Sequence, residues 1–114
     1  MIFSELNEHE VFKAFSEPIR LRIVALLTAG ELCVCDLTEV LGLPQSTVSR
    51  HMNRLKFNKI VTDRRSGKWI HYVLDTDFLK NFPELEALLH SMVGREPYKT
   101  ELARLQDYLR RRKC

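Results

Sequence analysis

In the first half of the chain, apolar residues recur every three or four positions, which is the spacing of one face of a helix. This period predicts a helix over about 4–15 and a second over about 18–28, opened by a proline that suits a first helical turn. A short third helix is expected over about 33–41, where Gly42 ends it. A fourth is expected over about 44–58. The order of these helices is long, long, short, then long.

The hydrophobic period then changes from that of helices to that of strands. Residues 60–65 and 69–74 are rich in β-branched and aromatic side chains, and Ser66-Gly67-Lys68 separates the two runs. Such a pair of runs around a glycine predicts a β-hairpin. Helical spacing returns over about 77–93 and again over about 98–112.

This order of elements predicts a mainly α winged helix-turn-helix fold in one domain, residues 1–114, with a β-hairpin as the wing. The recognition helix would be the segment at about 44–58, and the wing would span about 60–74. The terminal helices carry more apolar side chains than a short helical hairpin hides by itself: Leu85, Leu88, Leu89, Met92, Leu102, Leu105, Tyr108 and Leu109. We therefore expect a homodimer that pairs through the first and last helices, about 4–15 and 77–112.

Charge is distributed unevenly along the 114 residues, of which 45% are hydrophobic and 29% charged. The net charge of +3 comes from 18 basic and 15 acidic side chains. Between Val40 and Lys68 there are seven basic residues and one acidic residue, a net +6, which leaves −3 for the remainder. A basic centre in an acidic frame indicates a polyanionic partner, because binding phosphates releases condensed counterions.

The predicted recognition helix opens with short polar side chains, which allow its backbone to approach a DNA groove closely. Longer basic side chains follow on the helix and at the wing tip, and they can reach phosphates or guanine edges. The candidate DNA-binding residues are Gln45, Ser46, Thr47, Ser49, Arg50, Arg54, Arg65 and Lys68. His51 lies beside apolar positions of the same helix, so we interpret it as a packed side chain.

The phrase Glu31-Leu-Cys-Val-Cys-Asp-Leu37 holds two of the three cysteines. Inside a regular helix, side chains two positions apart point to nearly opposite sides. Cys33 falls at the predicted cap of the third helix, with Asp36 in the supporting position, so it can turn toward Cys35. The positive end of a helix favours thiolates, and thiolates are the ligands that soft ions prefer. The pair is therefore a candidate site for a thiophilic ion.

Three phrases together resemble the ArsR/SmtB family of bacterial metal-responsive repressors. They are residues 31–37, Ser-Thr-Val-Ser-Arg-His-Met at 46–52, and Gly-Lys-Trp-Ile-His-Tyr at 67–72. The resemblance implies a homodimer on an imperfect inverted repeat of operator DNA, released when an inducer binds. For the arsenical-resistance branch the inducer would be As(III), Sb(III) or methylarsenite, and no prosthetic group is implied.

The third donor to such an ion stays open. Arsenic-sensing members with similar phrasing carry a third cysteine three residues after the second, and this chain has Thr38 there. Cys114, of the same chain or of its partner, is one candidate. Alternatively, two sulfurs suffice for a methylated arsenical, or a small ligand completes the sphere. The cadmium/lead branch adds N-terminal cysteines, and this chain has none before Cys33.

Other function classes are constrained by what the sequence contains. No apolar run approaches the roughly 20 residues of a membrane span, and acidic residues stand near the N-terminus where a signal peptide is basic. We therefore expect a cytoplasmic protein with reduced thiols. No nucleophile–base set or phosphate loop indicates an enzyme. A redox-sensing repressor that uses Cys114 as an interchain partner remains an alternative, as does an interaction module with buried cysteines.

Overall fold

The fold consists of seven helices and one small sheet within residues 8–112, the part of the chain that the computed structural model describes. In order, the elements are α1 (Glu8–Phe15), α2 (Pro18–Leu27), β1 (Leu32–Cys33), α3 (Val34–Leu41), α4 (Gln45–Phe57), β2 (Val61–Ser66), β3 (Trp69–Leu74), α5 (Thr76–Asn81), α6 (Pro83–Met92) and α7 (Tyr98–Arg111). None of these helices is long and apolar enough to cross a bilayer. The predicted winged helix-turn-helix order is confirmed.

Local signals set the ends of the helices that carry the turn. The carboxylate of Glu17 caps α2 by accepting a 2.9 Å hydrogen bond from the Arg20 amide. Gly42 ends α3 in the left-handed conformation, with φ of 68°, and donates its amide to the carbonyl of Thr38. Pro44 then caps α4 in an extended conformation. The turn between α3 and α4 is therefore short, as the sequence predicts. The predicted start of the first helix, at about residue 4, lies outside the described residues.

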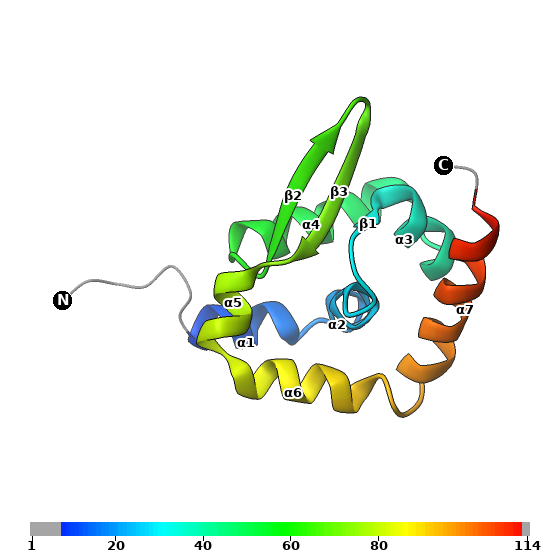
Figure 1. Ribbon diagram of the computed structural model, residues 1–114. Coiled ribbons are helices and arrows are strands. Elements are labelled where there is room, and N and C mark those ends of the chain that lie inside the picture. The colour runs from blue at the N-terminus through cyan, green and yellow to red at the C-terminus, as the bar shows by residue number, and fades with distance from the viewer. Residues whose placement is uncertain (1–7, 113–114) are drawn as a thin grey trace.

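The sheet has three antiparallel strands in the order β1-β3-β2. Strands β2 and β3 form the predicted wing, which projects from the helical body in Figure 1. Ser66 pairs with Trp69, so a two-residue turn joins the strands, and Gly67 supplies the positive φ of 62° that the turn needs. Strand β1 was not predicted, because two residues are too short for a period. It pairs Cys33 with His71, which attaches the cysteine-containing segment 31–37 to strand β3 of the wing.

The prediction of one helix over about 77–93 is wrong, because the chain forms α5 and α6 instead. Phe82 separates them in a non-helical conformation, with φ of −130° and ψ of 61°. The next residue, Pro83, disfavours helical geometry at the position before it and then opens α6. Phe82 packs its ring against Phe78 in the core, so the break is also held by burial.

Helix α7 packs on α2 and α3 of its own chain, on the far side of the body from α1 (Figure 1). Leu105 is fully buried there, and Glu101 forms a two-pronged ion pair with Arg22, with 2.6 Å between Nη2 and Oε2. Part of the apolar surface of the terminal helices, which the sequence led us to assign to a dimer interface, is thus buried against α2 and α3 of the same chain. Phe12 on α1 and Leu88 on α6 remain 60% and 42% exposed. The homodimer itself stays a prediction.

The substitution Leu105→Ala should lower the free energy of unfolding by about 2–5 kcal/mol, because it leaves a cavity between α7 and the core. Gln106→Ala, on the exposed side of the same helix, is the matched control and should change stability little. Urea unfolding followed by circular dichroism measures both. Equal effects would show that α7 is not packed on the body.

Candidate DNA-reading face and dithiol site

Helix α4 divides into a buried face and an exposed polar face. Val48, Met52 and Leu55 have no exposed surface, and they hold the helix against the core. The predicted polar residues lie on the other side. Gln45, Ser46, Arg50 and Arg54 are exposed, and Thr47 and Ser49 are half-buried. Arg65 lies on β2 and Lys68 in the turn of the wing, and both are exposed. The structure therefore brings all eight predicted residues to the recognition helix and the wing.

The basic side chains of this region fall into two groups. Lys56 pairs with Asp63 at 2.8 Å, and Arg64 pairs with Glu31 at 2.6 Å. Within residues 8–112, no ion pair involves Arg50, Arg54, Arg65 or Lys68. Lys68 instead lies over the ring of Trp69, 5.4 Å from its centroid. The cations predicted to meet DNA are thus the ones that the protein leaves without a carboxylate.

His51 is a packed residue of α4, as the sequence predicts. It is 7% exposed, and its Nδ1 accepts a 3.3 Å hydrogen bond from Arg20 and lies 3.6 Å from a Glu17 oxygen. Burial lowers the pKa of the imidazole, and the nearby arginines act in the same direction, although Glu17 opposes them. The surroundings of the ring therefore favour its neutral form inside the helix packing.

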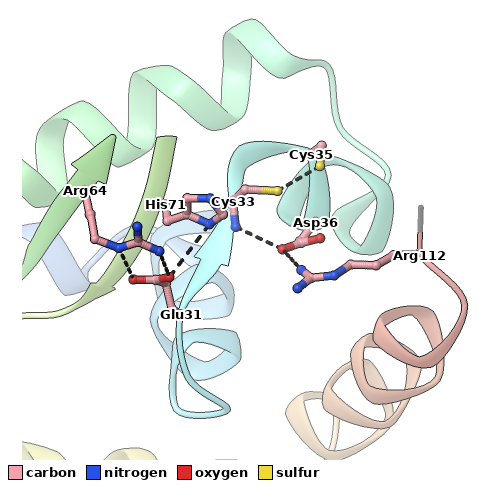
Figure 2. A network of polar contacts seen from close by, with 7 residues as sticks. All are labelled: Glu31, Cys33, Cys35, Asp36, Arg64, His71 and Arg112. Atoms are coloured by element: carbon pink, nitrogen blue, oxygen red, sulfur yellow. Dashed lines mark hydrogen bonds and ion pairs between the residues drawn. The ribbon is translucent and has the colours of Figure 1, made fainter. Parts of the chain in front are cut away.

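Cys33 and Cys35 meet at the start of α3, with 2.8 Å between their sulfur atoms (Figure 2). Cys33 is extended, with φ of −94° and ψ of 167°, because it ends β1 and caps α3. This conformation turns its side chain toward Cys35, as expected for a cap. The two are not joined by a disulfide, whose sulfurs lie about 2.05 Å apart. Because sulfur–metal bonds are about 2.3 Å long, two sulfurs this close could share one ion after a small movement apart.

A third group, the carboxylate of Asp36, stands beside the two sulfurs and has no exposed surface. Its Oδ2 accepts a 2.9 Å hydrogen bond from the amide of Cys33 and a 2.7 Å bond from Nη1 of Arg112 (Figure 2). The bond to the carboxylate raises the pKa of Arg112. Oδ2 of Asp36 thus connects the start of α3, where the two cysteines lie, to the end of α7.

Arg112 is the functional neighbour that sequence reasoning missed. It is 76 positions from Asp36 along the chain, and a basic C-terminal run carries no signal of a buried partner. Cys114, the predicted third donor, lies outside the described residues. Thr38 occupies the position where a third cysteine was expected, and its hydroxyl donates a 2.8 Å bond to the carbonyl of Val34.

The exposed polar face of α4, the wing and the unpaired cations beside them define a winged-helix DNA-binding protein. Residues 17–62 match the family model described as "Bacterial regulatory protein, arsR family". The arsenic resistance transcriptional regulator ArsR2 of Pseudomonas putida is 39% identical over 74% of this chain and 68% of its own length. The chain belongs to the ArsR family of transcriptional regulators, which are DNA-binding proteins and not enzymes.

Two further similarities agree with this assignment. The arsenical resistance operon repressor of Staphylococcus xylosus is 43% identical over 69% of this chain and 74% of its own. Among solved structures, the transcriptional repressor BigR of Xylella fastidiosa superposes with a TM-score of 0.64 at 29% identity. That match covers 75% of this chain and 82% of BigR. Both names are those of repressors.

The substitution Arg112→Gln should lower the free energy of unfolding by about 1–2 kcal/mol, because it leaves the buried Asp36 without its cation. The value is below that of a fully buried pair because solvent reaches the guanidinium, which is 37% exposed. Arg111→Gln is the control, since Arg111 pairs with Asp107 at the surface. Urea unfolding compares the two variants, and a control as destabilised as Arg112→Gln would contradict the role of the contact.

Proposed function

We propose that this regulator represses a metal(loid)-resistance operon and leaves its operator when trivalent arsenic or antimony, or a methylated arsenical, binds the thiolates of Cys33 and Cys35. The observation that carries the proposal is the 2.8 Å approach of the two sulfurs at the start of α3. The arsenical-resistance names of two relatives support the choice of ion. No prosthetic group is part of the proposal.

The position of the sulfurs supplies a way to couple the ion to DNA. The cap of α3 carries partial positive charge, which favours the thiolates that the ion needs. Drawing both sulfurs onto one ion moves Cys33, whose amide is bonded to Asp36. Helix α3 is joined to α4 by residues 42–44 and packs against it, so a movement at the start of α3 would tilt the recognition helix.

The proposed DNA complex is that of a homodimer on an inverted repeat, with one recognition helix in each half-site. Phe12 and Leu88 support pairing through α1 and α6, because both are large apolar side chains that stay exposed on those helices. Gln45, Ser46, Thr47 and Ser49 would lie closest to the bases. The four cations without carboxylate partners would contact phosphates or guanines. The proposed location is the cytoplasm, where thiols stay reduced.

Cys114 is the proposed third donor for arsenite, which has three exchangeable positions. Arg112 supports a same-chain role, because it lies two residues before Cys114 and its guanidinium is bonded to Asp36 beside the sulfurs. Two residues span at most about 7 Å, so Cys114 can come from the same protomer. The alternative is that the partner's Cys114 supplies the third sulfur. Replacing Arg112 would distinguish the two cases, because only a same-chain Cys114 depends on the contact between Arg112 and Asp36.

The double variant Cys33→Ser plus Cys35→Ser should bind operator DNA as the wild type does but no longer release it with arsenite, because the ion loses both thiolates. Fluorescence anisotropy of a duplex selected in vitro by the wild type measures the release, under strong reductant.

Cys114→Ser should shift the arsenite concentration at half-maximal release upward by about tenfold or more if one of three thiolate bonds is lost.

Each alternative function has its own outcome in that titration. A redox sensor would stay bound under reductant and leave DNA only on adding an oxidant. A cadmium/lead sensor would respond to those ions and not to arsenite. An interaction module with buried cysteines predicts that the double serine variant and the wild type respond alike, which would reject the site.

The substitution Arg50→Ala should weaken DNA binding at low salt and flatten its dependence on salt by about one counterion, if Arg50 contacts a phosphate. Lys56→Ala is the matched control on the same helix, because Lys56 is neutralised by Asp63. Anisotropy titrations at several salt concentrations give both slopes. An unchanged slope in Arg50→Ala would remove that residue from the phosphate contacts.

A further inference from the structure

A cleft of about 450 Å³ opens between α3, α4 and strand β3, directly beside the dithiol pair. Cys35 forms part of its wall. Val34, Trp69 and Ile70 supply an apolar side, and Trp69 is 41% exposed, which is unusual for so large an apolar side chain. Gln45 and Ser49, which belong to the predicted DNA-reading face, form the opposite side. The cleft thus joins the ion site to the DNA-binding surface.

Thr38 also lines this cleft, at the position where the arsenic-sensing proteins that the sequence resembles carry a third cysteine. Its hydroxyl donates its proton to the carbonyl of Val34, and a neutral hydroxyl oxygen is a poor ligand for a soft ion that prefers thiolates. Arsenic held by Cys33 and Cys35 would therefore face a cleft with one apolar side in place of a third sulfur, although the lining also includes Glu39. A ligand that needs only two sulfurs and carries its own apolar group matches both features.

We propose that the cleft is a binding site for the organic group of monosubstituted trivalent arsenicals, and that an aromatic substituent fits it better than methyl. The inference rests on the proposed function, because Cys33 and Cys35 hold the arsenic. Phenylarsenous acid is the smallest aromatic probe of this class. Its ring would lie among Val34, Trp69 and Ile70.

The chemistry of capture balances without an oxidant or reductant. Phenylarsenous acid carries two hydroxyl groups and one carbon on arsenic. Each thiol forms one As–S bond as one As–O bond breaks, and each thiol proton leaves with a hydroxide as water. Arsenic stays trivalent, the As–C bond remains intact, and no third sulfur is needed.

Such a ligand would act on DNA binding more directly than a bare ion. Gln45, Ser49 and Lys68 line the same cleft, so a ring seated there lies between the recognition helix and the wing. A duplex approaching these side chains would meet the ring. Release by an aromatic arsenical would then be less dependent on Cys114 than release by arsenite.

The test compares phenylarsenous acid with methylarsenous acid, each distributed by equilibrium dialysis between the protein and dithiothreitol. Dithiothreitol offers two sulfurs and no cleft, so it cancels the intrinsic affinity of each arsenical for a dithiol. Burying part of a phenyl ring should make the wild type prefer the phenyl compound by about tenfold. Trp69→Ala should reduce the preference below about threefold, because the ring loses its largest contact.

Val73→Ala is the matched control, because Val73 lies on the same strand, is 38% exposed and does not line the cleft. It should keep the wild-type preference. A second measurement uses the wild type alone: Trp69 is the one tryptophan of the chain, and its fluorescence should change more with the phenyl than with the methyl compound. This keeps the test valid if Trp69→Ala disturbs the wing.

The outcomes separate the two proposals. If the wild type binds neither arsenical, or if Cys33→Ser plus Cys35→Ser binds them equally well, the proposed function fails. If the wild type binds both but shows no phenyl preference over dithiothreitol, the cleft inference is overturned while the dithiol site stands. A preference that survives in Trp69→Ala, with Trp69 fluorescence unmoved by the ring, overturns it as well.

Discussion

The carboxylate of Asp36 holds together the parts of the chain on which the candidate site depends. It is fully buried and accepts hydrogen bonds from the amide of Cys33 and the guanidinium of Arg112. A buried charge needs such partners, since a carboxylate left unpaired inside a protein destabilises the fold. The partners fix the start of α3, the direction of the Cys33 side chain and the end of α7. The sulfur pair is therefore a product of this cap.

The same constraint connects parts of the molecule that have separate tasks. On one side of α3 stand the recognition helix and the wing, where Arg50, Arg54, Arg65 and Lys68 have no carboxylate partners among the described residues. On the other side lies α7, anchored by its ion pair between Glu101 and Arg22. Helix α3, which begins at the cysteine pair, thus contacts both the helix of the DNA-binding face and the C-terminal helix.

Local chemistry explains where prediction from sequence succeeds and where it fails. The end of α3 at Gly42 and the hairpin turn at Gly67 could be predicted because a backbone with positive φ favours glycine. The break at Phe82 was missed although Pro83 signals it, because the helical period continues on both sides. Strand β1 has two residues, too few for a pattern, and exists only because β3 lies alongside.

The sequence by itself determined the order of the first four helices, the wing, the polar face of α4 and the pairing of two cysteines at a helix cap, because these features depend on residues close together in the chain. Tertiary structure alone decided that α7 folds back on α2 and α3, that Arg112 reaches Asp36, and that a cleft opens beside Cys35. Those features join residues as many as 76 positions apart. Only packing of the whole chain brings such residues into contact, since no local period records which partner a buried charge will find.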